Sequence, residues 1–297
     1  MRIFDGVTLV VFISILLGFI WPTPGLLLKP LLMYLLIIMM FFSCLKINLK
    51  ELREVPKNWW RYLILMLIIF VVPPSIIYLF HSWLQDMILV GLIVTAAMPA
   101  GIAIVFLSDL IGGESVKALV ATTLAHILSP LVVPMITWFF VHEIVRIPFL
   151  DMVLLISELV VIPLLLAQLV RLSRWSKQIA KAGTRLNLVL LFLLIWSSIA
   201  LARSSILSHL GQFIIASAIV SVVFILVILF SAWFGRNKKE RITWAVATTY
   251  KNFTLATVVI VTMFGPLAMV GAAVYDILDN LLLIPIKWWA ARSNHHK

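Results

Sequence analysis

Apolar residues occur along this chain in runs of nearly twenty, separated by short polar stretches, from one end of the sequence to the other. A helix of about 20 apolar residues spans the roughly 30 Å hydrocarbon core of a bilayer. The pattern therefore predicts an all-α polytopic membrane protein with no soluble domain. Its ten predicted spans are residues 3–20, 30–45, 62–80, 86–108, 116–140, 149–170, 186–202, 212–234, 242–264 and 267–288.

Two of these spans carry polar or helix-breaking residues where an apolar helix should be continuous. The sequence TAAMPAGIAIVF, from Thr95 to Phe106, contains Pro99 and Gly101, and TTYKNFTLATVV, from Thr248 to Val259, contains Lys251 and Asn252. Interrupted helices at corresponding positions in the two halves of a membrane protein are typical of a transporter site near the bilayer midplane.

The two halves of the chain are predicted to be repeats, at residues 1–148 and 149–297. A shift of 151 residues places Pro134 on Pro285, and the same shift places Gly101 on Asn252 and Ser129 on Asn280. With five spans in each half, an odd number, the second copy must be inverted in the membrane. The order of the spans and the position of the interruptions carry this interpretation, since residue-level similarity is weak.

Composition agrees with this class of protein. Hydrophobic residues make up 63% of the 297 residues and charged residues 12%, roughly half of the charged fraction in a soluble domain. The first apolar run could also be a signal peptide, but Trp21, Pro22 and Pro24 follow it instead of a small-residue cleavage site. The single cysteine, Cys44, excludes an intrachain disulfide.

The net charge of +11 is explained by membrane topology rather than by nucleic-acid binding. With an even number of spans and the N-terminus inside, most basic residues fall on the cytoplasmic side, while Lys29, Arg146 and Arg203 fall outside. Both termini are therefore predicted to be cytoplasmic, in the inner membrane of a bacterium. The inside set is Arg2, Lys46, Lys50, Arg53, Lys57, Arg61, Lys117, Arg171, Arg174, Lys177, Lys181, Arg185, Arg236, Lys238, Lys239, Arg241, Lys287, Arg292 and Lys297.

Three stretches of the chain resemble the bile acid:sodium symporter family of secondary transporters. They are MMFFSCLKINLKEL at 39–52, AAMPAGIAIVFLSDLIGGESVKALVATTLAHILSPLVVP at 96–134 and YKNFTLA at 250–256. The family's recurrent glycines, prolines and serine match Pro99, Gly101, Gly113, Ser129, Pro130 and Pro134. The resemblance covers nearly the whole chain. It implies ten helices in two inverted repeats, with two broken helices that cross in a core domain and a separate panel domain.

The sequence departs from that family at positions that hold sodium in its sodium-coupled members. Their Ser-Asn pair after the first turn is Ile104 and Val105 here, and their glutamate five residues before the matching asparagine is Ala247. Their glutamine before that asparagine is Lys251. The aligned hydroxyl positions of the fifth span are Thr122 and His126. Because hard cations need oxygen ligands, the resemblance implies that neither sodium site of the family is kept.

Ionisable residues inside the spans are candidates for function, because placing one there costs at least about 2.5–3.5 kcal/mol. Lys251 is interpreted as a fixed or titrating cation, or as one member of a structural ion pair. Asp276, Asp279 and Asn280 share one face of the last span, and either carboxylate is a candidate partner for Lys251. The spare carboxylate would favour protonation; capping of broken backbone is the alternative.

His126 and Glu158 are weaker candidates. His126 is predicted either to take part in coupling or to be a packing residue, and Glu158, in the sixth span, either lines a cavity or bonds to a neighbour. Motifs for phosphate loops, metalloproteases and serine hydrolases, and metal-binding cysteine pairs, do not occur, so no metal or cofactor is predicted.

The prediction is a secondary transporter that moves a small organic anion by alternating access, proton-coupled or uncoupled, and independent of sodium. The alternative is an exporter or facilitator of a weak acid or a metalloid oxyanion, as in the related arsenite exporters. A membrane enzyme or a sensor is the alternative from another class. The oligomeric state is left open.

Overall fold

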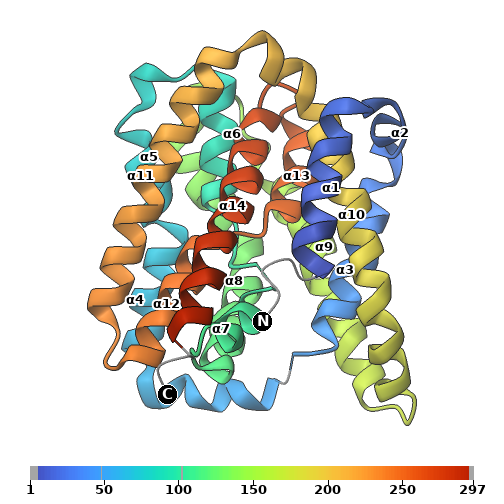
Figure 1. Ribbon diagram of the computed structural model, residues 1–297, viewed down its shortest axis with the longest axis vertical. Coiled ribbons are helices and arrows are strands. Elements are labelled where there is room, and N and C mark those ends of the chain that lie inside the picture. Colours follow the sequence, from blue (N-terminus) through green and yellow to red (C-terminus); the bar gives the residue numbers. More distant parts are fainter. Residues whose placement is uncertain (1–5, 48, 102, 294–297) are drawn as a thin grey trace.

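The computed structural model describes residues 6–47, 49–101 and 103–293. Within these ranges the chain forms α-helices and short 3-10 helices, apart from one isolated backbone bridge. Of the predicted topogenic residues, Arg2 and Lys297 lie outside the described residues. The helices run side by side along the long axis of the molecule (Figure 1). The prediction of an all-α polytopic membrane protein is thus confirmed in its fold class.

The described residues of the first half form eight α-helices. They are α1 (Gly6–Ile20), α2 (Pro22–Leu27), α3 (Leu32–Cys44), α4 (Trp59–Phe70), α5 (Val72–Tyr78), α6 (Asp86–Ala96), α7 (Ile104–Leu110) and α8 (Ser115–Val141). Four 3-10 helices connect them, η1 (Lys29–Leu31), η2 (Leu49–Glu54), η3 (Pro56–Asn58) and η4 (His81–Trp83).

The described residues of the second half, 149–293, form six more. They are α9 (Phe149–Arg171), α10 (Ser176–Ser208), α11 (Leu210–Phe234), α12 (Lys238–Thr249), α13 (Phe253–Met263) and α14 (Met269–Ser293). In the described part of the chain, five helical segments are long and apolar enough to cross a bilayer: Glu51–Tyr78, Ser115–Val141, Phe149–Arg171, Ser176–Ser208 and Leu210–Ser231. Shorter apolar helices lie between them, so the count of ten spans and the inverted repeat stay predictions.

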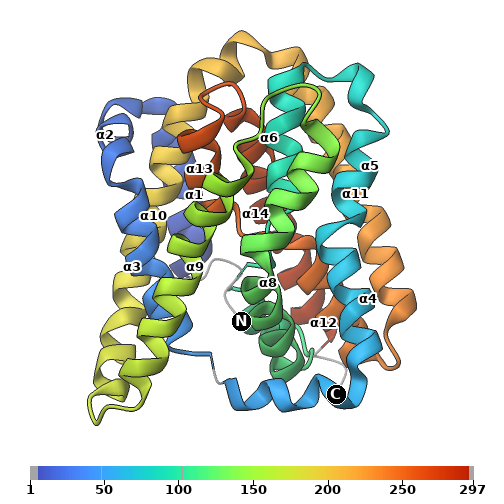
Figure 2. The ribbon, with the colours of Figure 1, turned by 180° about the vertical axis from the view of Figure 1, so that it is seen from behind.

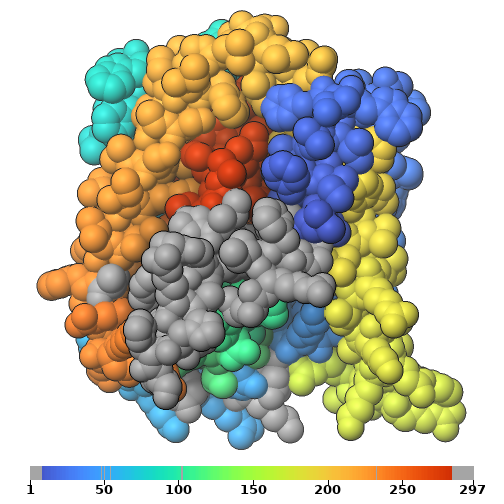
Figure 3. All heavy atoms as spheres, in the orientation of Figure 1, coloured from blue at the N-terminus to red at the C-terminus, as the bar shows by residue number. Residues whose placement is uncertain are grey.

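The helices form two groups. In one, α10 packs along α1, α2 and α3, and α9 packs along α3 (Figure 1, Figure 2). The other contains α4 to α8 and α11 to α14, and it holds both interrupted segments. On the face shown in Figure 3, α14 reaches the surface between α11 and α1.

Proline residues shape the long helix α8, and polar side chains compensate for them. Pro130 lacks the N–H that would normally bond to the carbonyl of His126 four residues earlier. The hydroxyl of Ser129 donates to that carbonyl instead, at 2.8 Å. In an apolar interior an unsatisfied carbonyl is costly, so Ser129 has a structural role that accounts for a serine before this proline.

Small residues let α6 and α14 cross at close range inside the second group. A Cβ atom on Gly91 would lie 1.9 Å from the carbonyl oxygen of Ala268. A Cβ atom on Gly271 would lie 2.3 Å from the backbone nitrogen of Leu92. Close approach of backbones at small residues is a common way to pack membrane helices, and here it fixes the start of α14 against the middle of α6.

Candidate functional site

The two interruptions predicted from the sequence meet in the centre of the second helix group. The first lies between α6 and α7 and the second between α12 and α13. Ala100 and Lys251 form an antiparallel bridge. The backbone N–H of Gly101 donates to the carbonyl of Tyr250 and that of Asn252 donates to the carbonyl of Pro99, both at 2.9 Å. Each break therefore supplies hydrogen-bond partners that the other lacks, as a buried backbone requires.

Gly101 is needed where the two chains touch. A Cβ atom at this position would lie 3.0 Å from the Tyr250 ring and 3.1 Å from the carbonyl oxygen of Lys251. The carbonyl of Pro99 accepts the hydrogen bond from the backbone N–H of Asn252. Like any proline, Pro99 has no backbone N–H that would need a partner. The structure brings Pro99, Gly101, Lys251 and Asn252 together.

Lys251 is buried, with 1% of its surface exposed. Its ammonium group donates to the carbonyl of Ile69, near the last turn of α4, and lies 3.5 Å from the carbonyl of Met98, just beyond α6. The C-terminal ends of helices carry partial negative charge. The cation is therefore held by backbone oxygens at two helix ends.

The predicted ion pair between Lys251 and a carboxylate of α14 is wrong in this structure. Among the described residues, no salt bridge joins Lys251 to Asp276 or Asp279. Asp279 instead accepts a hydrogen bond from the backbone N–H of Lys251, at 3.2 Å. The reason is the direction of the lysine side chain, which extends to the end of α4.

Asp276, Asp279 and Asn280 are buried together on α14, as their spacing predicts. The Asn280 amide donates to the carbonyl and to the carboxylate of Asp276, at 2.7 Å and 2.8 Å. The Tyr250 hydroxyl donates to the Asn280 oxygen at 3.4 Å. One oxygen of each carboxylate, Asp276 Oδ2 and Asp279 Oδ1, is buried without a hydrogen-bond partner. The cluster therefore keeps unused acceptor capacity.

Asn252 links the second break to His126. Its Oδ1 atom accepts from the backbone N–H of Leu255 at 3.1 Å and from the hydroxyl of Thr254 at 2.9 Å, which caps the N-terminus of α13. Its Nδ2 atom lies 3.2 Å from Nε2 of His126. The other ring nitrogen, Nδ1, lies 2.8 Å from the carbonyl of Thr122.

This chain of contacts fixes the hydrogen atoms. A backbone N–H can only donate, so Oδ1 of Asn252 faces Leu255 and the amide N–H faces the histidine. A carbonyl can only accept, so Nδ1 of His126 carries the hydrogen and Nε2 is the acceptor. The geometry fits neutral His126 alone.

Thr122 and Glu158 lie less directly at the crossing. The Thr122 hydroxyl donates within α8 to the carbonyl of Ala118, at 2.8 Å. Thr122 contributes to the site only through its backbone carbonyl, which accepts a hydrogen bond from the His126 ring. Glu158 has an exposed side chain on α9, so it is not one of the buried polar groups. Ile104 and Ala247, at sodium positions of the resembled family, are fully buried apolar residues, and Val105 is partly buried.

A small, open-sided pocket lies on one side of the crossing, with about 350 Å³ of space when the part open to solvent is included. Tyr250, Thr249 and Asp279 contribute its polar lining, and the apolar lining comes from Leu107, Ile228, Val246 and Leu282. Asp279 therefore contacts both the backbone of the second break and this pocket.

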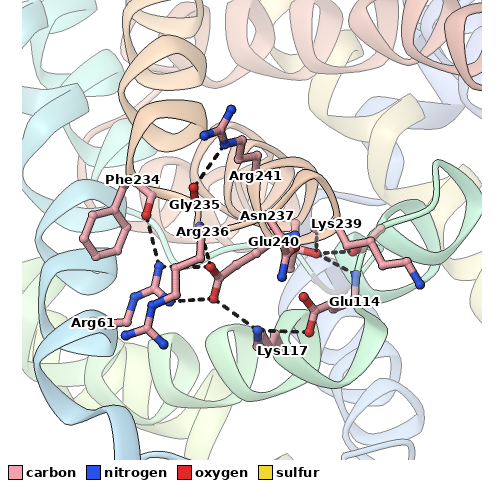
Figure 4. A network of polar contacts seen from close by, with 12 residues as sticks. Arg61, Glu114, Lys117, Phe234, Gly235, Arg236, Asn237, Lys239, Glu240 and Arg241 are labelled. Carbon is pink, nitrogen blue, oxygen red and sulfur yellow. Dashed lines mark hydrogen bonds and ion pairs between the residues drawn. The ribbon is translucent and has the colours of Figure 1, made fainter.

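Arg61 and Glu240 form a second polar centre, which sequence reasoning missed (Figure 4). Arg61 was predicted as a loop cation, but it is buried at 4% exposure and pairs with Glu240 at 2.8 Å. Lys117 lies 3.1 Å from Glu240 and 3.0 Å from Glu114. The pairing of Arg61 with Glu240 could not be seen in the sequence, because the two residues are 179 positions apart and each lies near a predicted loop.

Comparison with known proteins places the chain among transporters. Residues 5–278 match the SBF-like CPA transporter family. A protein of Bacillus subtilis (strain 168), named an uncharacterized sodium-dependent transporter, YocS, is 23% identical over 282 residues, which cover 93% of this chain and 87% of the relative. The apolar helices and the family together establish an integral membrane protein that transports a small molecule and is not an enzyme. The resemblance noted from the sequence is confirmed, and the chain belongs to the SBF-like CPA transporter family.

Proposed function

We propose that this protein is a secondary transporter of a small organic anion, that it works by alternating access, and that it needs no sodium. The observation that carries the proposal is the pairing of the two interrupted segments around Lys251 and Asn252. Transporter sites are typically built where half-helices begin and end at mid-membrane depth.

The architecture that we propose has ten spans in two inverted repeats, 1–148 and 149–297. Three pairs of short helices each count as one span: α4 with α5, α6 with α7, and α12 with α13. The group of α1, α2, α3, α9 and α10 would be the panel, and the other helices the core, which moves against it. The distribution of basic residues supports cytoplasmic termini and an inner-membrane location. A reporter fused to the C-terminus and scored outside the cytoplasm would contradict this orientation.

The anion would bind beside the start of α13. The N-terminal end of a helix carries partial positive charge. Lys251 adds a full charge one residue before the Asn252 cap, and α7 begins close to the same crossing. Positive charge at the start of α13 supports an anionic substrate.

Sodium independence rests on two features. The first is that Ile104, Val105 and Ala247 offer no side-chain oxygen. The second is that the Lys251 ammonium group already bonds to the backbone oxygens of Ile69 and Met98. Carbonyl oxygens at the C-terminal ends of half-helices are the ligands that a coupling ion would otherwise use. In this proposal the lysine takes the place of the ion.

His126 is the group through which we propose that a proton would act. Protonation of Nε2 would place an N–H against the amide N–H of Asn252. The amide would have to turn, and Leu255 and Thr254 would lose their common acceptor. Their donors would then be available to an anion, so proton binding would favour anion binding at α13.

Sodium coupling is the second candidate. The relative is named sodium-dependent, and Asp276 and Asp279 each keep a buried oxygen without a partner. A sodium ion on these carboxylates would lie outside the positions that the resembled family uses. Uptake experiments separate the two candidates directly.

The test begins with thermal unfolding of the purified protein against a panel of carboxylates and sulfonates, in sodium and in potassium buffers. A stabilising compound is then used for uptake into proteoliposomes. We expect equal uptake in both buffers, stimulation by an inward proton gradient, and loss of uptake in Lys251→Met but not in the control Lys57→Met. Uptake that requires sodium and is lost in Asp279→Asn would support the second candidate. Normal uptake by Lys251→Met would refute the proposed site.

A further inference from the structure

A second pocket lies beside the Arg61–Glu240 centre, where α4, α8 and α12 begin. It is open on one side and has about 270 Å³ of space when the part open to solvent is included. Three of its lining side chains are basic, Arg61, Lys117 and Arg236, and one, Glu240, is acidic; Asn58, Tyr62 and Trp244 complete the lining. It is separate from the crossing of the interrupted helices and has no part in the function proposed above.

The acidic residue of this pocket is already saturated. Glu240 Oε1 accepts from Arg61 Nη1 at 2.8 Å and from Lys117 at 3.1 Å. Glu240 Oε2 accepts from Arg61 Nη2 at 3.0 Å and from the backbone N–H of Arg236 at 2.7 Å. The carboxylate therefore has four donors. Glu114 also pairs with Lys117 at 3.0 Å, so the three basic side chains of the lining face two acidic ones and keep a small excess of positive charge.

Two donors in the lining have no acceptor. Arg61 and Trp244 are 4% and 2% exposed, and the N–H groups at Arg61 Nε and Trp244 Nε1 are buried without a hydrogen-bond partner. A buried donor left unpaired costs about 1–3 kcal/mol. Guanidinium and indole N–H groups can only donate, so the missing partner must be an acceptor.

We propose that this pocket binds a phosphate-type oxyanion, which is either free phosphate or the headgroup of an anionic lipid. Arginine presents its N–H groups in a fork that fits such oxygens, and the lysine and the indole add donors from two other helices. Trp59 and Trp60, at the start of α4, are exposed beside the pocket lining residue Asn58. Exposed tryptophans are typical of the membrane interface, where lipid phosphates lie.

The experiment uses the purified full chain in detergent and measures thermal unfolding at constant ionic strength. One arm adds inorganic phosphate, and the other adds dihexanoyl-phosphatidylglycerol, with dihexanoyl-phosphatidylcholine as the lipid control. A ligand that binds the folded state alone raises its stability in a saturable way. Saturation by phosphate indicates the free anion, and saturation by phosphatidylglycerol alone indicates a lipid headgroup. Absence of saturation in both arms overturns the proposal.

Trp244→Phe provides the sharper test, because it keeps an aromatic ring and removes the unpaired N–H. We expect about tenfold weaker binding of the active probe, without a loss of stability in the absence of the probe. The matched control is Trp196→Phe, whose indole N–H donates to the carbonyl of Trp21 at 3.1 Å, far along the sequence from this pocket. Equal affinity in Trp244→Phe and the unmutated protein would overturn the assignment of this donor to the site.

Discussion

The two buried polar centres of this protein differ in the partners of their charged side chains. At the entry of α4, α8 and α12, Arg61 and Glu240 form a two-point ion pair, and Lys117 adds a third member. At the crossing of the interrupted helices, Lys251 is held by carbonyl oxygens, while Asp276 and Asp279 each keep an oxygen without a partner. One centre pairs its charges side chain to side chain, and the other does not.

The difference lies in how each centre satisfies its carboxylates. The Arg61–Glu240 pair and Lys117 together join three helices, and the saturated carboxylate gains nothing from further binding. Unused acceptors and an unpaired cation cost stability, and they persist where a substrate or an ion completes them. Variants that remove a charge should therefore act in opposite directions at the two centres.

The largest effect is expected from Arg61→Met. It leaves the buried Glu240 with only partial compensation, and breaking a buried pair costs about 3–5 kcal/mol. Unfolding of the purified protein in a denaturing detergent titration measures the loss. Arg53→Met, on the exposed surface of η2, is the control and should change stability little.

The double variant Arg61→Met/Glu240→Gln extends this test. Removing both charges should recover much of the loss, because no buried charge is left unpaired. If the double variant were as unstable as the two single losses added together, the pair would not be coupled.

The pH dependence of Glu240 gives a smaller effect. Burial by itself raises the pKa of Glu240, but the Arg236 backbone N–H and the Arg61 and Lys117 side chains outweigh it and hold the pKa below its ordinary 4.5. The stabilisation is therefore complete above pH 4.5 and is lost as the pH falls through the lower pKa of the folded state. Thermal unfolding should show Glu240→Gln converging on the unmutated protein only below pH 4.5.

Asp279→Asn should act in the other direction. An amide oxygen still accepts from the backbone N–H of Lys251, and the substitution removes the negative charge of a buried carboxylate that has one unpartnered oxygen. Removing a buried charge that has no salt-bridge partner should stabilise the protein by about 1–3 kcal/mol. The same unfolding titration measures the gain. A loss of stability of that size would mean that the carboxylate has a partner, and would place both centres in the same class.

Much of the crossing was predictable from the sequence. Pro99, Gly101, Lys251 and Asn252 stand out because they interrupt apolar runs, and the spacing of Asp276 and Asp279 fixes their common face. Contacts between distant segments were not predictable in this way. The direction of the Lys251 side chain depends on where α4 ends in space, and no local pattern relates it to Ile69.

Arg61 illustrates the same limit at the other centre. A basic residue next to a predicted loop has an adequate explanation in membrane topology. Its burial follows only when α12 places Glu240 beside it. From the sequence, His126 could be either a packing residue or part of the coupling mechanism. The contact that bears on this choice, between His126 and the Asn252 amide, is seen only in the structure.

The smallest effects are expected at Asn252, where substitutions separate two roles of one side chain. Asn252→Ala removes the cap of α13 and should cost about 1 kcal/mol. Asn252→Ser keeps an acceptor for the Leu255 N–H but loses the contact with His126. Asn252→Asp keeps the cap as well, and its carboxylate would pair with a protonated His126. Stability should therefore fall in the alanine variant and be largely kept in the other two.

Transport distinguishes the roles further. If His126 releases the cap on protonation, Asn252→Ser should lose the response of uptake to a proton gradient while keeping a folded protein. Asn252→Asp should fix His126 in its protonated form and also lose that response. Uptake that follows the proton gradient normally in both variants would show that the amide contact with His126 is a packing contact. The crossing would then carry its coupling on the carboxylates of α14, as the unpartnered oxygens of Asp276 and Asp279 allow.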